Sequence, residues 1–423
     1  MNQAKINLIA ADMGYGHQRA AYPLLDIALN NKIITINNYE GIPVWETKYW
    51  KNSLASYEKI SRLKKIPILG TLVFEIMDAF QKIDPFYPKR DLSKPTTQEK
   101  FFYQVVKRGL GKDLVAKLNE TKLPFLTTFF VAAYFAEAQN YQGDIYCVIC
   151  DTDASRSWAN LDSQKTRVKY LLPSEKVKER FMMYGVPENN LAVTGFPLPK
   201  ENIGANKEIL ISDLATRLKH LDSKGIYLEK YSDLVENYLP EKNINRPLTI
   251  TYAVGGAGAQ KEIGLTIVRN LKDKIIDGSL AVNLVAGNRL DVKDYFTEGL
   301  KNLGLDNNVN IQIIFDADKI NYFKIFNQAL RNTDILWTKP SELSFYCALG
   351  LPIIMSQPVG SQEDFNREWL LNVGAGVDSY DPEHVEEWLP DLLESGRLAR
   401  AAMDGFLNAE AMGTYNIEKI FNE

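Results

Sequence analysis

Side chains able to bind sugar hydroxyls and phosphate are concentrated between residues 337 and 376. The apolar run 334–337 predicts a strand, and Ser341 is the expected N-cap of a helix that ends at Gly350. The unpaired N–H groups at such a helix start attract phosphate. Beyond the next predicted strand, amide and carboxylate groups that can donate to and accept from sugar hydroxyls follow one another: Gln362, Glu363 and Asn366. We interpret this stretch as a sugar-nucleotide pocket, the alternative being an ordinary solvated loop.

A second candidate phosphate site is the turn after the predicted strand 248–254. It contains Gly255, Gly256 and Gly258, and a helix is predicted to begin near Gln260. Small residues let backbone N–H groups approach a diphosphate closely. The alternative is a turn that needs glycine only for tight packing.

Gly14 and Gly16 form a similar turn after the first predicted strand, where a dinucleotide fingerprint could stand. Arg19 occupies the position of the third glycine in that fingerprint. The second predicted strand ends in two asparagines, and Glu40 is a late candidate for the acidic ribose ligand. NAD binding is therefore the weaker interpretation.

Composition narrows the class of protein. The chain has 423 residues, 45% of them hydrophobic, which suffices for more than one buried core. Its net charge of -4 provides no general attraction for nucleic acid, so nucleic acid is not an expected partner. We find neither an apolar leader nor a run of about 18 uninterrupted apolar residues. These features predict a cytoplasmic enzyme.

The three cysteines do not form a metal site in this interpretation. Cys147 and Cys150 have C-x-x-C spacing but fall in a predicted buried strand, where residues three apart point to opposite faces. Cys347 is the remaining thiol. We expect structural cysteines and no bound metal.

The hydrophobic pattern predicts an α/β protein. The N-terminal half opens with a strand over 6–11, a helix over 18–30 and a strand over 33–37, a βαβ unit. Strands over 144–150 and 168–172 extend the same parallel sheet. The C-terminal half has five short apolar strands, each followed by a helix-like segment: 248–254, 281–286, 310–315, 334–337 and 352–355.

We therefore predict two Rossmann-like, doubly wound domains. The first covers residues 1–200 and carries a helical insertion over 45–123. Residues 201–246 form a helical linker or insertion, and residues 247–400 form the second domain. Residues 401–423 are a C-terminal helical segment, with a return to the first domain as one option.

Motifs that resemble those of glycosyltransferase family 28 occur in the right order along most of the chain. Residues 12–21 resemble the family's Gly-rich turn with its following histidine, 151–153 resemble its Thr-Asp motif, and 170–174 with 193–197 resemble its PS…VTGxP segment. In the C-terminal half the likeness is carried by Lys339, Pro340, Gly350, Leu351, Pro352, Gln362, Glu363, Asn366 and Gly374 to Gly376.

This resemblance implies the GT-B architecture, in which two Rossmann-like domains face each other across a cleft. It also implies inverting transfer from a nucleoside diphosphate sugar, a UDP-sugar, with no obligatory metal or other cofactor. The second domain would hold the donor, and Asn288 and Arg289 resemble the family's base-side loop. Gly14, Gly16 and Thr152 would lie on the acceptor side. The acceptor stays open, with a membrane lipid among the candidates.

Inverting transfer needs a base that deprotonates the attacking hydroxyl. His17 is the strongest candidate because it directly follows the N-terminal glycine turn, and Asp12 and Asp153 are its rivals. The alternative for His17 is a histidine that only caps a helix or binds phosphate. For the two aspartates it is a solvated loop position.

The chain departs from the family pattern at the residue that binds the ribose. Alignment back from Gly350 places Phe345 where the family has a glutamate, and Glu342 is the proposed substitute. Two alternatives therefore stay open. One is a sugar-nucleotide epimerase or hydrolase of the same fold, and the other is a nucleotide-sugar-binding protein without catalysis.

The insertion 45–123 mixes aromatic residues with lysines between Trp45 and Leu69. Such a face suits peripheral contact with an anionic membrane, at the inner side if the protein is cytoplasmic. A helix with core aromatics and solvated lysines has the same pattern, and it is the slightly favoured interpretation.

Overall fold

The computed structural model describes residues 5–52, 82–243, 245–255, 258–358 and 361–422. The chain divides into two compact units. Unit 1 comprises Met1–Pro197, Gly360–Phe365 and Met412–Glu423, and unit 2 comprises Leu198–Val359 and Asn366–Ala411. Residues 201–246, expected as a linker or insertion, are thus grouped with unit 2, and the expected C-terminal segment is divided at residue 412.

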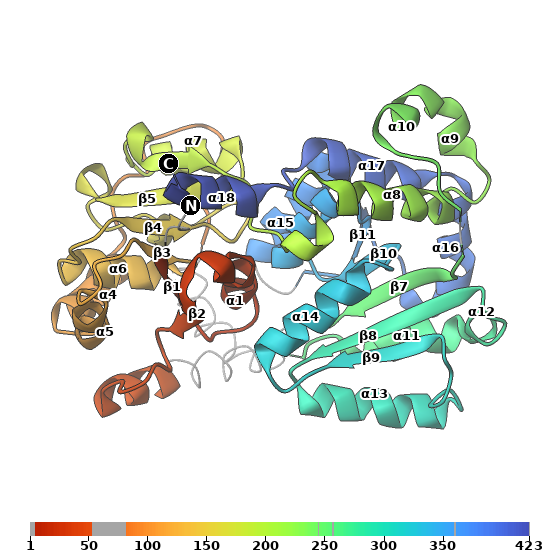
Figure 1. Cartoon of the computed structure of the whole chain (residues 1–423), viewed down its shortest axis with the longest axis horizontal. Coiled ribbons are helices and arrows are strands. Elements are labelled where there is room, and N and C mark those ends of the chain that lie inside the picture. Colours follow the sequence, from red (N-terminus) through yellow and green to blue (C-terminus); the bar gives the residue numbers. More distant parts are fainter. Residues whose placement is uncertain (1–4, 53–81, 244, 256–257, 359–360, 423) are drawn as a thin grey trace. The chain divides into compact units, whose positions relative to one another are not determined.

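Unit 1 is built on a six-stranded parallel sheet with the order β2-β1-β3-β4-β5-β6 (Figure 1). Its strands are β1 (Ile6–Ala10), β2 (Ala28–Thr35), β3 (Phe125–Thr127), β4 (Ile145–Val148), β5 (Val168–Leu172) and β6 (Leu191–Val193). The strand order reverses between β1 and β3. In open parallel sheets, ligands bind where the order reverses, outside the carboxyl ends of the strands.

The helix predicted after β1 is shorter than expected. It consists of α1 (Gly16–Ala21), and the 3₁₀ helix η1 (Tyr22–Ile27) follows with a proline in its first turn. Proline lacks the N–H that would continue the α-helical ladder, so the chain tightens and enters β2 at residue 28. The predicted helix 18–30 and strand 33–37 were therefore wrong in their bounds.

The other main helices of unit 1 are α4 (Thr97–Lys107), α5 (Lys112–Leu118), α6 (Phe130–Ala138), α7 (Glu175–Met183) and α18 (Gly413–Asn422). At the N-cap of α7, the Ser174 hydroxyl accepts from the Val177 N–H at 3.4 Å. Ile417 of α18 is buried in the same apolar core as Leu8 and Leu126. Part of the predicted insertion, residues 53–81, and with it most of its lysine-rich face, lies outside the described residues.

Unit 2 has a second six-stranded parallel sheet, with the order β12-β11-β10-β7-β8-β9 (Figure 1). Its strands are β7 (Leu248–Ala253), β8 (Leu280–Gly287), β9 (Ile311–Phe315), β10 (Ile335–Thr338), β11 (Ile353–Met355) and β12 (Gly376–Asp378). Counted along the unit, this is the strand order 3-2-1-4-5-6 of dinucleotide-binding sheets, with its reversal between β7 and β10.

The helices of unit 2 cover this sheet. They are α8 (Glu208–Leu221), α9 (Ile226–Lys230), α10 (Ser232–Tyr238), α11 (Lys261–Asn270), α12 (Lys272–Ile276), α13 (Leu290–Asn302), α14 (Lys319–Leu330), the 3₁₀ helix η6 (Glu342–Leu349), α15 (Ser361–Val373), whose first residues group with unit 1, α16 (Val385–Glu394) and α17 (Arg397–Asn408). Leu214 and Leu218 of α8 are buried in the main core of the unit, so this helix is an integral layer. None of the helices within the described residues is long and apolar enough to cross a membrane.

Candidate functional site

At the reversal point of unit 2, the turn after β7 and the end of β10 lie against each other. The Thr338 hydroxyl donates to the Ala253 carbonyl at 3.1 Å, which ties the two strand ends together. A Cβ atom added to Gly255 would come within 2.5 Å of the Lys339 Cε atom, so the lysine side chain passes directly over this glycine. A larger residue at position 255 would displace the end of this lysine side chain.

The same turn also lies beside Arg289, which follows β8. A Cβ atom on Gly258, which has a φ of +76°, would lie 3.5 Å from the Arg289 Nε atom. The Gly258 N–H closes the turn by donating to the Gly255 carbonyl at 2.8 Å. Gly255, Gly258, Arg289 and Lys339 are therefore brought together at the carboxyl edge of the sheet. Gly256, also predicted there, lies outside the described residues.

Arg289 is held by a neighbouring carboxylate. Its Nε and Nη2 atoms donate to the two carboxylate oxygens of Asp291, each at 3.0 Å. Hydrogen bonding from this guanidinium lowers the pKa of Asp291. Asn288, which directly follows β8 and precedes Arg289, is half-buried. This bidentate pair orients the arginine and compensates part of its charge.

Ser341 is the N-cap residue of the following helix, as predicted, but its side chain does not cap that helix. Helix η6 begins at Glu342 as a 3₁₀ helix, and the Ser341 side chain makes no capping hydrogen bond. Instead, the Ser341 backbone carbonyl accepts from the Ser344 N–H at 2.9 Å. The predicted end of the helix at Gly350 is confirmed by its φ of +66°.

Phe345 belongs to the apolar core of unit 2. Its ring is 4% exposed and lies 5.2 Å, between ring centroids, from the ring of Trp369 on α15. A carboxylate at this position would be buried, so the substitution by phenylalanine agrees with the packing. Glu342, one turn earlier, is half-buried at the start of η6.

The predicted sugar-binding residues lie on the first turns of α15. Gln362 and Glu363 are half-buried, whereas Asn366, one turn later, is buried. The loop before this helix is connected to the Gly-rich turn, because the Gln260 amide donates to the Gln357 carbonyl at 3.0 Å. Sequence reasoning had not found Gln260 or Lys339 as residues that position the turn.

His17 lies at the reversal point of unit 1, at the start of α1. Its Nδ1 atom is 2.7 Å from the Thr128 carbonyl oxygen, and the Thr128 hydroxyl donates to the His17 carbonyl at 2.7 Å. A carbonyl only accepts, so Nδ1 carries the proton in this arrangement and the lone pair of the neutral ring is on Nε2. The ring centroids of Phe129 and Trp158 lie 4.7 and 6.1 Å from the centroid of the imidazole.

The glycine turn before His17 is held by the segment that directly follows β2. The Asn37 side chain accepts from the Asp12 N–H at 2.9 Å and donates to the Asp12 carbonyl at 3.0 Å. Gly14 has a φ of +98°, and α1 begins at Gly16. Asn37 thus stabilises the turn. In a dinucleotide-binding protein this place would carry the acidic residue that binds the ribose, so the arrangement weakens the NAD interpretation further.

Asp153 forms a buried ion pair instead of lining an open loop. Its two carboxylate oxygens accept from Nε and Nη2 of Arg180 at 2.9 and 2.8 Å, and both side chains are at most 1% exposed. Thr152 is also buried. A carboxylate held in this way is a poor candidate for a general base, and the sequence had not indicated its partner 27 residues away on α7.

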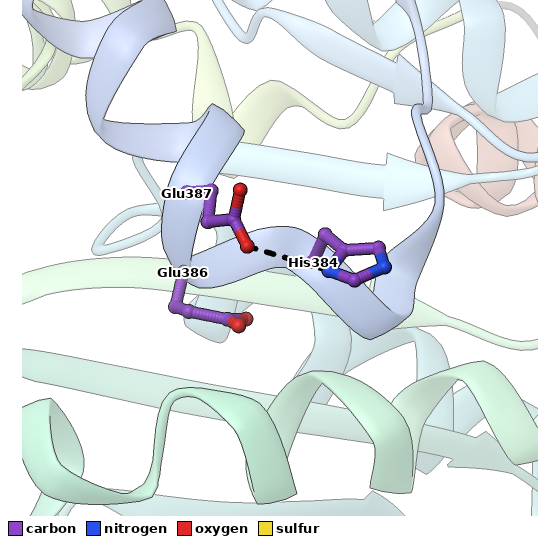
Figure 2. A group of neighbouring side chains, drawn as sticks. All are labelled: His384, Glu386 and Glu387. Carbon is purple, nitrogen blue, oxygen red and sulfur yellow. Dashed lines mark ion pairs between the residues drawn. The ribbon is translucent and has the colours of Figure 1, made fainter.

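Within the described residues, one group of side chains has three potential metal-ligand atoms within 4.8 Å of one another: His384, Glu386 and Glu387, at the start of α16 (Figure 2). All three side chains are exposed, and the His384 Nδ1 atom lies 3.4 Å from a Glu387 oxygen. Exposed acidic groups of this kind are common on protein surfaces, so we assign no metal to them.

Comparisons with known proteins agree with this architecture. The chain is 25% identical over 333 residues to the processive diacylglycerol beta-glucosyltransferase of Staphylococcus saprophyticus, covering 77% of this chain and 73% of that protein. It is 20% identical over 401 residues to the protein of the same name from Bacillus subtilis, covering 92% and 87%. A family model described as a domain of unknown function (DUF6938) matches residues 301–419.

Among solved structures, MurG of Acinetobacter baumannii superimposes with a TM-score of 0.50 at 13% identity, over 99% of both chains. This similarity supports the fold. The homology to glycosyltransferases comes from the two sequence relatives. The resemblance found in the sequence is thus confirmed, and the chain is a divergent relative of the family 28 glycosyltransferases, with a GT-B fold built from two doubly wound units.

Proposed function

We propose that this protein transfers a hexose from a UDP-sugar to a lipid acceptor with inversion at the anomeric carbon. In this proposal the carboxyl edge of the unit 2 sheet and the first turns of α15 bind the donor, and His17 supplies the catalytic base. The acceptor class is inferred from the names of the relatives, which act on diacylglycerol.

The observation that carries the proposal is the arrangement at the reversal point of unit 2. Gly255 and Gly258 bring no side chains of their own to the turn, and Lys339 and Arg289 border it. Backbone dipoles and cations can stabilise the charge that develops on a departing nucleoside diphosphate. Glu342 is proposed to accept from the ribose hydroxyls, and Gln362, Glu363 and Asn366 to bind the hexose.

His17 is proposed to act as the base. The acceptor hydroxyl gives its proton to Nε2, its oxygen forms the new bond to the anomeric carbon, and the bond from that carbon to the diphosphate breaks. The hydrogen bond from Nδ1 to the Thr128 carbonyl stabilises the imidazolium that results. Asp12 remains the alternative base.

Peripheral contact with the inner face of the membrane is proposed for unit 1. Val44 and Trp45, in the helical residues 44–52, are 86% and 50% exposed. Exposed apolar side chains on a helix can enter the interface of a bilayer. A cytoplasmic enzyme with such a surface could reach an acceptor that stays in the membrane.

A non-catalytic nucleotide-sugar-binding protein is the second candidate, since Phe345 stands at the family's ribose-glutamate position. A thermal-shift screen of nucleoside diphosphates and their sugars tests binding, because a ligand specific for the folded state raises the melting temperature. Incubation with the stabilising donor and diacylglycerol vesicles, followed by mass spectrometry of the lipids, tests transfer. A glycolipid product supports the enzyme. Binding without transfer to a panel of lipid acceptors supports the second candidate, and hydrolysis or epimerisation of the donor supports another enzyme class.

A further inference from the structure

A pocket of about 430 Å³ lies in unit 1 between the helical residues 44–52 and the segment 108–116. Its lining includes Trp45, Glu46, Arg108, Lys112 and Asp113. The volume lies within the usual range of small-molecule sites. None of these residues has a part in the proposed sugar transfer.

Glu46 carries a buried carboxyl group at this pocket. The residue is 1% exposed, and its Oε2 atom has no hydrogen-bond partner within the described part of the chain. The Gly111 backbone provides a hydrogen bond to the carboxyl group. Buried polar atoms in proteins are nearly always paired, so an unpaired acceptor on a pocket wall indicates a ligand that donates a hydrogen bond, such as a hydroxyl.

The charges of the pocket favour an anionic group on the same ligand. Asp113 is already compensated, since its Oδ2 atom accepts from the Tyr39 hydroxyl at 3.1 Å and lies 2.9 Å from the Lys117 ammonium. In the described ranges, Arg108 and Lys112 form no ion pair. A guanidinium presents several donors at once and matches the oxygens of a phosphate.

We propose that this pocket binds a polyol phosphate, with the phosphate at Arg108 and Lys112 and a hydroxyl donating to Glu46. The half-exposed indole of Trp45 provides an apolar face for the carbon chain of the ligand. The inference rests on unit 1 alone and holds even if no sugar is transferred. Two sources share this chemistry, a soluble polyol phosphate and the phosphoglycerol headgroup of an anionic lipid.

Calorimetric titration of the full chain with sn-glycerol 3-phosphate tests the soluble source. We expect Glu46→Leu and Arg108→Ala each to weaken binding about tenfold, as for loss of a hydrogen bond to a charged group. Glu120→Leu and Lys100→Ala remove exposed charges of the same type outside the pocket and should leave the affinity unchanged. Glycerol and inorganic phosphate, each with half of the recognised groups, should bind at least tenfold more weakly. Melting temperatures of all variants verify folding.

Cosedimentation with phosphatidylglycerol vesicles, against phosphatidylcholine vesicles, tests the lipid source. Selective binding to phosphatidylglycerol that is weakened by both pocket variants, without binding of glycerol 3-phosphate, assigns the ligand to the lipid. The proposal is overturned if neither probe binds, or if binding of both probes is unchanged in folded Glu46→Leu and Arg108→Ala.

Discussion

His17 and Thr128 hold each other through two hydrogen bonds of 2.7 Å, one from the imidazole to the Thr128 carbonyl and one from the threonine hydroxyl to the His17 carbonyl. They join the turns after β1 and β3, where the strand order of unit 1 reverses. The arrangement fixes the imidazole tautomer at a point where open sheets bind ligands.

His17→Ala should lower turnover by about 10² to 10⁴, the usual effect of removing a general base. We expect little change in melting temperature, because the histidine is only half-buried. Product formation with the donor and acceptor found by screening is the measurement. Near-normal turnover would transfer the role to Asp12, whereas a large loss of stability would indicate a structural role for His17.

Glu342→Ala should weaken binding of the cognate nucleotide by about 1 to 3 kcal/mol, the cost of leaving polar groups unpaired. Calorimetric titration measures the dissociation constant. Glu386→Ala, at an exposed position of α16, is the matched control. An unchanged dissociation constant in Glu342→Ala would reject its role at the ribose.

Asp153→Asn should destabilise unit 1 by about 3 to 5 kcal/mol, because it leaves the Arg180 guanidinium buried without its counter-charge. Chemical denaturation measures the change. Asp162→Asn removes a carboxylate from an exposed ion pair and should cost less than about 1 kcal/mol. If Asp153→Asn kept its stability but lost all turnover, the aspartate would have a catalytic role after all.

Asp334 makes the stability of unit 2 depend on acid pH. It is fully buried, and its oxygens accept from Arg246 at 2.6 and 2.7 Å and from the Thr249 N–H at 2.8 Å. Burial opposes ionisation, but the hydrogen bonds from Arg246 and the nearby His220 imidazole, whose Nδ1 atom lies 3.1 Å from an Asp334 oxygen, outweigh it and lower the pKa. The contribution to stability is therefore present above the unfolded-state pKa of about 3.9 and is lost as pH falls through the lower folded-state value.

Asp334→Asn should accordingly lower the melting temperature of unit 2 at pH 7 and make it less sensitive to pH below about 4. Thermal unfolding at a series of pH values measures both effects. Asp294→Asn, an exposed change on α13, should retain the acid sensitivity of the parent protein. An unaltered pH profile in Asp334→Asn would contradict the prediction.

Glu46 should have the opposite pH dependence. Burial, and to a lesser extent the charge of Asp113, raise the pKa of Glu46 to about 7, although the Gly111 hydrogen bond acts against them. The folded state then binds the proton more tightly, so the contribution to stability is full below the unfolded-state pKa of about 4.3 and is lost as pH rises through about 7. Glu46→Gln should raise the melting temperature at pH 8 more than at pH 4. Equal shifts at the two pH values, or a shift also seen in Glu120→Gln, would contradict this.

The sequence by itself predicted the two doubly wound sheets. Strand 168–172 matches β5, and the strands of unit 2 were located within one or two residues, because buried parallel strands are near-continuous apolar runs bounded by turns. Strands β3, β6 and β12 were not predicted. Each has only three residues, which gives a weak signal, although β11 has the same length and was predicted.

The sequence also predicted the Gly-rich turns and the order of the motifs, because glycine at a turn indicates a special backbone conformation or a close approach of another group. This local information located His17, Gly255 and Gly258 next to strand ends. It also indicated Phe345 as a departure, but not that the ring packs on Trp369.

Only the tertiary structure decided which side chains and backbone groups the candidate site residues contact. The ion pair of Asp153 with Arg180, the passage of Lys339 over Gly255 and the tautomer of His17 each depend on residues distant in sequence. The Glu46 oxygen that has no hydrogen-bond partner among the described residues likewise emerged only when segments about 60 residues apart were packed together. Hydrophobic periodicity and turn residues indicate only the local structure of the chain. Burial and hydrogen-bond pairing depend on contacts between elements, and such contacts decide whether a carboxylate acts as a base, a counter-ion or a ligand.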